Sequence, residues 1–227
     1  MRMSVKLTLT ALAAALMLAS AIGTASAGRL STSNQNFRIT WTSLEFVSTV
    51  TIRCPVTLEG SFHYRSIIKR ERSLIGLVTR AIVNQAGCVN GTGSAFNGTE
   101  RYNGIVPAST LPWHVTYESF AGVLPNISSI RLLLARTRFG IETGFFAGEC
   151  AVQVGSATDN ISADAAREPG GNITTLTPTE GRNRATIIQV DEDPFGACPR
   201  EGETGALRGI GQVTLLGNTT RIRITLI

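Results

Sequence analysis

The sequence lacks the short motifs that mark common enzymes and metal centres. It contains only two histidines, His63 and His114, and has no His-Glu-x-x-His, Gly-x-Ser-x-Gly or Cys-x-x-Cys pattern. The first motif is typical of zinc proteases, the second of serine hydrolases with an α/β fold, and the third of zinc sites. We therefore expect no metal and no cofactor. A secreted hydrolase that uses His63 or His114 in a triad built from distant residues stays open as an alternative.

Lysine is also scarce, and the charge is only mildly positive. Of 21 basic residues, only Lys6 and Lys69 are lysines, while Ala, Gly and Thr are abundant. This bias indicates a GC-rich coding genome and hence a bacterial source. The formal net charge is +5 for the whole chain, well short of the basic excess that is typical of nucleic-acid-binding proteins. Nucleic acid is therefore not expected as a partner.

The longest apolar run lies at the N-terminus and predicts a secretory signal peptide over residues 1–27. Arg2 and Lys6 precede an apolar stretch from Leu7 to Ile22, and Ala25-Ser26-Ala27 supplies a small-x-small cleavage pattern. The stretch of about 16 residues is shorter than the ~20 needed to span a membrane. We expect cleavage after Ala27, with no stable membrane insertion afterwards. Residues 28–227 should then form a single β domain that is secreted or associated with the cell envelope.

Four cysteines remain after that cleavage, at positions 54, 88, 150 and 198. An even number of cysteines in an exported chain predicts two disulfides, for which three pairings are possible. We favour Cys54–Cys88 with Cys150–Cys198, because these pairs fasten each half of the chain locally.

Alternation of apolar and polar residues is the dominant pattern in the rest of the chain and predicts β-strands. Its phase slips near Ser43, where we expect a bulge. Frequent Gly and Asn turns between short strands favour an all-β, single-domain antiparallel sandwich or barrel-like fold with long loops. The residues expected on buried faces are Phe37, Ile39 and Trp41; Val56, Leu58, Gly60, Phe62 and Tyr64; Leu111, Trp113, Val115 and Tyr117; Ile130, Leu132 and Leu134; Val213, Leu215, Ile222, Ile224 and Leu226.

Several segments carry weaker signals. Residues 73–84 fit either a helical face or a strand, with a strand favoured by Gly76 and the β-branched content. One or two helical turns are possible from Ser162 to Arg167, and the stretch Gly155–Arg184 as a whole resembles a loop. A turn at Gly217-Asn218 predicts that the last two strands form a hairpin.

Two charged clusters are candidate sites. Asp191-Glu192-Asp193 could hold calcium, or serve with Glu149 or Glu180 as a glycosidase carboxylate pair, although three adjacent carboxylates usually mark a solvated turn. The window from Arg65 to Arg72 is the most basic, with Arg65, Lys69, Arg70 and Arg72, and is expected at a hairpin tip or loop. It could meet an acidic cell-wall polymer or a membrane surface, or simply keep the protein soluble.

Two segments suggest a family. The stretch Leu111-Pro112-Trp113-His114-Val115-Thr116-Tyr117-Glu118-Ser119-Phe120, and the stretch from Arg53 to His63, resemble a family of uncharacterised exported proteins of actinobacteria. The resemblance implies an exported single domain and transfers no catalytic residue. Together with the missing motifs, it leads us to expect a non-catalytic binding or structural β domain. A cell-wall polymer or another exported protein is the expected partner.

Overall fold

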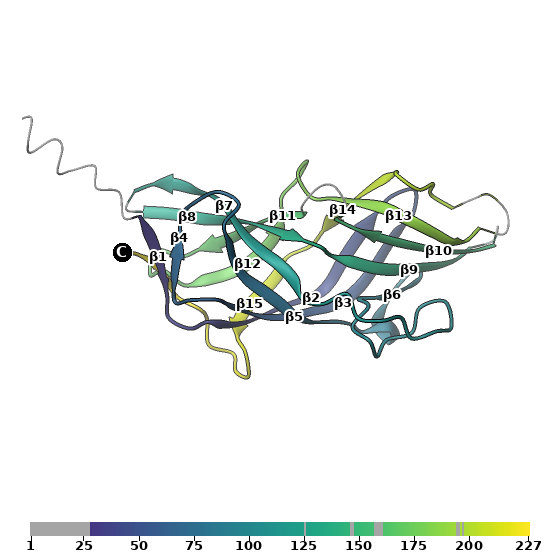
Figure 1. Ribbon diagram of the computed structural model, residues 1–227, viewed down its shortest axis with the longest axis horizontal. Coiled ribbons are helices and arrows are strands. Elements are labelled where there is room, and N and C mark those ends of the chain that lie inside the picture. Colours follow the sequence, from purple (N-terminus) through teal and green to yellow (C-terminus); the bar gives the residue numbers. More distant parts are fainter. Residues whose placement is uncertain (1–27, 125, 146–147, 157–160, 194–195, 197) are drawn as a thin grey trace, which may run out of the picture.

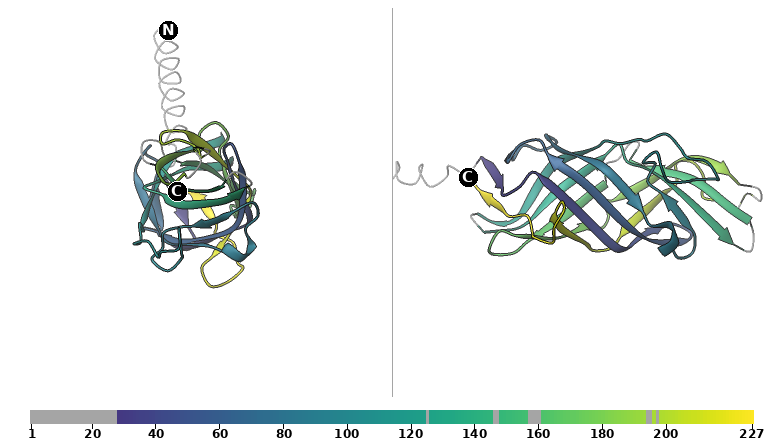
Figure 2. Two further views of the ribbon diagram at one scale, coloured as in Figure 1. Left: turned by 90° about the vertical axis from the view of Figure 1, so that its right-hand side faces the viewer. Right: turned by 90° about the horizontal axis from the view of Figure 1, so that it is seen from below.

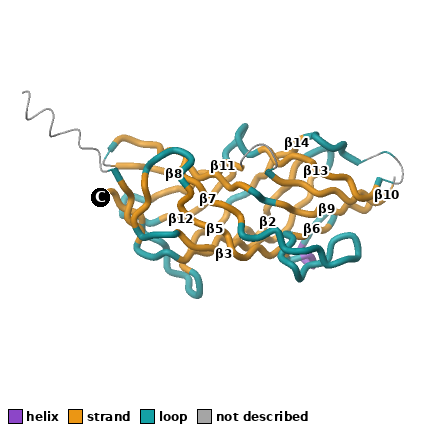
Figure 3. Tube along the Cα trace, in the orientation of Figure 1, coloured by secondary structure: helices purple, strands orange, loops and turns teal. Residues whose placement is uncertain are grey.

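The computed structural model describes residues 28–124, 126–145, 148–156, 161–193, 196 and 198–227, so the predicted signal peptide lies outside it. The fold is all-β, as predicted, and the ribbon is elongated (Figure 1). Strands account for nearly all regular structure, and a short 3₁₀ turn, η1 (Gln85–Gly87), follows the fifth strand (Figure 3). No helix within the described ranges has the length and apolar character to cross a membrane.

Eight strands form a closed antiparallel barrel. Taken in chain order, each strand pairs with the next, and the last pairs back with the first through Val213 opposite Ile39. Viewed along the long axis, the strands surround a common centre (Figure 2, left). The barrel strands are β2 (Asn36–Val47), β3 (Thr51–Phe62), β5 (Leu74–Val83), β7 (Trp113–Val123), β8 (Asn126–Ala135), β11 (Ile161–Arg167), β12 (Ile173–Pro178) and β15 (Gly211–Leu215).

Strand β2 is shared between the barrel and a second sheet. Its first half, from Phe37 to Thr40, pairs with β15, and its second half, from Glu45 to Val47, pairs with β14 (Thr204–Arg208). A register shift against β3 separates the halves, between Trp41 and Leu44. The bulge predicted near Ser43 is therefore confirmed, and it marks where the sheet leaves the barrel. The extension continues from β14 through β13 (Arg184–Glu192), β10 (Gly148–Gly155), β9 (Arg138–Phe145) and β6 (Thr92–Ser94).

Three short strands cap the other end of the barrel. They are β1 (Arg29–Thr32), β4 (Ser66–Ile68) and β16 (Ile224–Leu226), in the order β16-β1-β4. Leu30 of β1 is fully buried, and Ile67 and Ile224 are also buried. Figures 1 and 2 place β1 and the C-terminus together at this end.

The predicted C-terminal hairpin is wrong. The chain does turn after β15, where the Leu215 N–H donates to the Thr220 carbonyl (2.7 Å). However, both edges of β15 are already occupied, by β12 and β2, so β16 pairs with β1 instead.

Three other segments, whose sequence signals were weak, form strands. Residues 74–83 form β5, which confirms the favoured strand. Ser162–Arg167 belongs to strand β11 and not to a helix, and the loop-like stretch Gly155–Arg184 contains both β11 and β12. The inward residues of β11 include Ala163 and Ala165, whose small side chains give a weak alternating signal. The expected burial of Tyr64 is also wrong: β3 ends at Phe62, and Tyr64 is 75% exposed.

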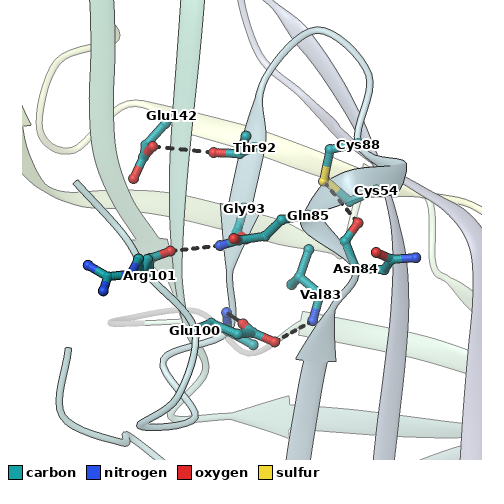
Figure 4. The surroundings of a disulfide bond; sticks show 11 residues. Cys54, Val83, Asn84, Gln85, Cys88, Thr92, Gly93, Glu100, Arg101 and Glu142 are labelled. Carbon is teal, nitrogen blue, oxygen red and sulfur yellow. Dashed lines mark hydrogen bonds between the residues drawn. A yellow bond between two sulfur atoms is a disulfide. The ribbon is translucent and has the colours of Figure 1, made fainter. Parts of the chain in front are cut away.

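Both disulfides join the expected pairs, Cys54–Cys88 and Cys150–Cys198. The first ties β3 to the residue that follows η1 (Figure 4). The second ties β10 to the connection between β13 and β14. Each bond therefore fastens a connecting segment to a strand of the sheet.

Candidate functional site

The barrel encloses a cavity of about 100 Å³. Every side chain that lines it is apolar, and all eight barrel strands contribute. This follows from the alternation in the sequence, since a closed barrel turns one face of every strand inward. The aromatic lining residues are Phe37, Trp41, Phe62 and Phe139, and the remainder are aliphatic.

The cap closes one end of this cavity. Leu30 of β1, Ile67 of β4 and Ile224 of β16 all line it, together with Ile222 just before β16. The cap strands are only three or four residues long. At this end, therefore, the cavity is separated from solvent by short strands.

A second cavity of about 50 Å³ lies where the barrel joins the extension. Leu44, Val56, Phe139 and Leu207 line both cavities and so form the partition between them. The polar side chains of the second cavity are Thr92 and Ser94 of β6. Ser94 is already engaged, because its hydroxyl accepts a hydrogen bond from the Phe96 N–H (3.2 Å).

The two histidines lie outside both cavities. His63 is exposed just after β3, and His114 is half-buried in β7, on the outward face opposite Leu77 and Ala135. Strand β5 separates β3 from β7. Within the described part of the chain, no hydrogen bond or ion pair joins either imidazole to a carboxylate or a hydroxyl. The geometry therefore does not bring His63 or His114 into a triad.

The acidic run, residues 191–193, binds the connection between β6 and β7 to the extension. Asp191 accepts hydrogen bonds from the Tyr102 hydroxyl (2.9 Å) and from the side-chain amides of Gln153 (2.7 Å) and Gln189 (2.6 Å). Burial raises the pKa of Tyr102, and the neighbouring Asp191 carboxylate raises it further, so this phenol stays protonated as a donor. Asp193 accepts from the Cys198 N–H (3.2 Å).

The calcium and glycosidase interpretations find no support in this geometry. Among the described residues, no group of three or more His, Cys, Asp or Glu side chains is placed to hold a metal ion. Glu180 is exposed in the connection between β12 and β13, and the side chain of Glu149 lies outside what the structure describes.

A polar cluster on the outside of the barrel was not predicted. The buried Ser162 hydroxyl donates to Glu118 (2.8 Å), whose other oxygen pairs with Arg182 (2.7 Å). Nearby, Arg131 makes two hydrogen bonds to Asp164 (2.8 and 3.1 Å). The pKa of Arg131 is raised, mainly by its hydrogen bond to Asp164. Each charge in this cluster is paired with a charge of opposite sign, so these side chains are engaged with one another. No local motif could reveal this cluster, because its members come from four separate segments.

The basic window lies at the capped end. Arg65, Arg70 and Arg72 are exposed, and the segment contains strand β4 as well as the expected turn. Lys69 is half-buried, with its ammonium 5.4 Å from the centre of the Phe120 ring. The predicted surface residues are therefore neighbours in space as well as in sequence.

Comparison of the chain with models of known families, with curated proteins and with solved structures gives no match. The resemblance to exported actinobacterial proteins stays a prediction.

Proposed function

We propose that the protein is an exported, non-catalytic binding protein whose barrel holds a small apolar guest. The observation that carries this proposal is the cavity of about 100 Å³ with an entirely apolar lining. Eight strands give an interior that side chains just fill or that accommodates one small ligand. Here the side chains leave space.

Water is a poor occupant of that space. A buried water molecule needs two to four polar partners, and an engineered apolar cavity of about 150 Å³ stays dry and binds benzene or xenon. An apolar guest, in contrast, gains contacts that the lining residues otherwise lack. At ~0.8 kcal/mol per buried carbon group, burial of a guest the size of benzene would contribute at most ~5 kcal/mol, so the Kd should be no lower than ~0.2 mM.

The lining also favours binding over catalysis. Acid–base and nucleophilic catalysis require a titratable or nucleophilic side chain within hydrogen-bond reach of the substrate. The side chains around the larger cavity are all aliphatic or aromatic, and none presents a polar atom to the space. A guest in this cavity would therefore be held and not transformed.

Export is the second part of the proposal. The predicted signal peptide supports it, and the two disulfides fit an oxidising environment outside the cytoplasm. We propose that the protein acts as a secreted or envelope-associated carrier.

A binding titration tests the guest. The protein, purified from a host that exports it, is titrated with benzene and with phenol while backbone amide chemical shifts are recorded. We expect benzene to bind with a sub-millimolar Kd and to shift amides of the barrel strands. Phenol should bind about tenfold more weakly, because its hydroxyl would be buried without a partner.

Two neighbouring alanines of β11 provide matched variants. Ala165 lines the cavity, whereas Ala166 does not. Ala165→Leu should abolish benzene binding and Ala166→Leu should leave it unchanged. If Ala165→Leu fails to fold, the smaller change Ala163→Val in the same lining replaces it. Equal binding of benzene and phenol, or full binding by a folded Ala165→Leu variant, would contradict the proposal.

A further inference from the structure

The capped end of the molecule carries an exposed surface that combines apolar and basic side chains. It is formed by β1, the segment from β4 to Leu74, the tip of the β7–β8 hairpin and the C-terminal residue. We call it the cap surface. Its residues are Arg29, Arg65, Ile68, Lys69, Arg70, Glu71, Arg72, Leu74, Val123, Leu124 and Ile227.

Backbone contacts bring these segments together. Arg29 lies opposite Ile68 in the β1–β4 pair, and the Ile227 N–H donates to the Arg29 carbonyl (3.1 Å). The Arg72 N–H donates to the Tyr117 carbonyl of β7 (2.7 Å), and Lys69 lies over Phe120 further along the same strand. The segments that form this surface therefore lie at the same end of the barrel (Figure 1).

The hairpin tip exposes two apolar side chains. Val123 is 82% exposed, and Leu124 beside it is also exposed. One guanidinium joins this hairpin, close to its tip, to the cap, because Arg167 donates to the carbonyls of both Ile127 (3.0 Å) and Ile224 (2.9 Å). Ile68, Leu74 and Ile227 add further exposed apolar side chains.

The cap surface also holds the positive charge of the chain. It carries five basic side chains and one acidic side chain, Glu71, for a net charge of +4. Residues 28–227 contain 21 − 2 = 19 basic and 16 acidic residues, for a net charge of +3. The rest of this part of the chain is therefore close to neutral. Removal of residues 1–27 would also place the positive α-amino group of Gly28 at this end. Its charge would offset the negative charge of the C-terminal carboxylate of Ile227.

We propose that the cap surface docks the protein peripherally on an anionic phospholipid bilayer. Basic side chains next to exposed apolar ones match the interface of such a membrane, where the headgroups are negative and the acyl boundary takes up Val and Leu side chains. A soluble polyanion would satisfy the arginines but would leave Val123 and Leu124 in water. The apolar tip therefore favours the membrane.

Docking would also place the capped end of the apolar cavity against the bilayer. Leu30, Ile67 and Ile224 of the cap line that cavity, so a guest that passes the cap would move between two apolar environments. This consequence rests on the proposed function, whereas the docking itself does not.

Co-sedimentation with vesicles tests the docking. The exported protein, with its N-terminus verified by mass spectrometry, is mixed with vesicles of phosphatidylcholine containing phosphatidylglycerol, or of phosphatidylcholine alone. We expect binding to the anionic vesicles only, and weaker binding at high salt. Each basic side chain near the surface contributes about fivefold to affinity, so Arg70→Ala/Arg72→Ala should bind about 25-fold more weakly.

Matched variants lie away from the cap. Arg184 of β13 and Arg200 after it are exposed on the extension, and Arg184→Ala/Arg200→Ala should bind the vesicles normally. Val123→Asp should lose most of the binding, while Ile105→Asp, at a residue 64% exposed in the connection between β6 and β7, should not.

Three outcomes would overturn the docking. They are equal binding to neutral and anionic vesicles, no binding to either, and binding to soluble polyphosphate that Val123→Asp leaves intact while vesicles are not bound. The last outcome would assign the basic residues to an acidic polymer. None of these outcomes bears on benzene binding, so the two proposals fail separately.

Discussion

At the scale of single residues, Gly140 and Gly211 allow close packing where a side chain would collide with a neighbour. A Cβ at Gly140 of β9 would lie 2.1 Å from Cδ2 of Tyr102, and a Cβ at Gly211 would lie 2.5 Å from Cε2 of Trp41. Tyr102 is buried with Phe96 against β9 and β10. Gly140 is thus what allows the segment between β6 and β7 to pack on the extension.

Replacing Gly140 should be destabilising for this reason. Gly140→Ala is expected to lower the free energy of unfolding by about 2–3 kcal/mol, because Tyr102 has to shift out of a well-packed site. A Cβ at Gly144, in the same strand, would have no neighbouring atom within 4 Å. Gly144→Ala should therefore be neutral or slightly stabilising. Urea unfolding of both variants checks this, and equal effects would contradict it.

Glu100 provides a pH-dependent contribution to stability. Its carboxylate accepts hydrogen bonds from the Val83 and Ala95 N–H groups (both 2.7 Å; the Val83 bond is drawn in Figure 4). Burial raises the pKa of Glu100 above its ordinary value of 4.5, and the N–H donors offset only part of the effect. Because the folded-state pKa exceeds the unfolded one, the folded state binds the proton more tightly. This contribution to stability is present at low pH and is lost as the pH rises through the folded-state pKa.

Glu100→Gln removes that titration. The wild type should lose stability relative to Glu100→Gln as the pH rises above the ordinary glutamate pKa of 4.5 and through the folded-state pKa. Denaturant unfolding at a series of pH values measures the difference. A difference that stays constant, or that grows in favour of the wild type, would show that Glu100 is not the group responsible.

At the scale of elements, the sequence predicted strands best where inward residues are large. Phe37, Ile39 and Trp41 in β2 alternate clearly with polar residues, and the bulge that follows was visible as a change of phase. In β11 the inward residues include Ala163 and Ala165, which contrast little with their neighbours. The alternation of apolar and polar residues therefore depends on the size of the inward side chains as well as on strand structure.

The pairing of strands was less predictable than their existence. β15 and β16 are consecutive and joined by a turn, yet they belong to different sheets. Hydrogen bonding of β15 to β2 closes the barrel, and this depends on the whole chain. The Glu118–Ser162 hydrogen bond also depends on the fold of the whole chain, because it joins residues that lie 44 positions apart.

The disulfides act at this scale by fastening connections to strands. They close loops with sequence separations of 34 and 48 residues. Loops of this size predict a stabilisation of about 3–4 kcal/mol per bond. Cys150→Ala/Cys198→Ala should lower the free energy of unfolding by that amount, measured with denaturant. A loss below about 1 kcal/mol would mean that this bond contributes little to the folded state.

At the scale of the whole molecule, the cavity and the cap surface follow from closure of the barrel. All-β structure, the cysteine pairs and the exposed basic window could be predicted from local sequence. The cavity could not, because its volume depends on how side chains from eight strands and the cap meet in space. The cap surface likewise combines the predicted basic residues with a hairpin tip about 50 positions further along the chain.

The central claim is that the barrel interior is a dry apolar cavity that accepts a guest. A crystal structure of the exported protein under xenon pressure tests it most directly, since xenon enters dry apolar cavities without needing any polar contact. We predict a xenon atom among the apolar side chains that line the barrel cavity, and none there in Ala165→Leu. Ordered water in that space, or a filled interior without xenon, would contradict the account.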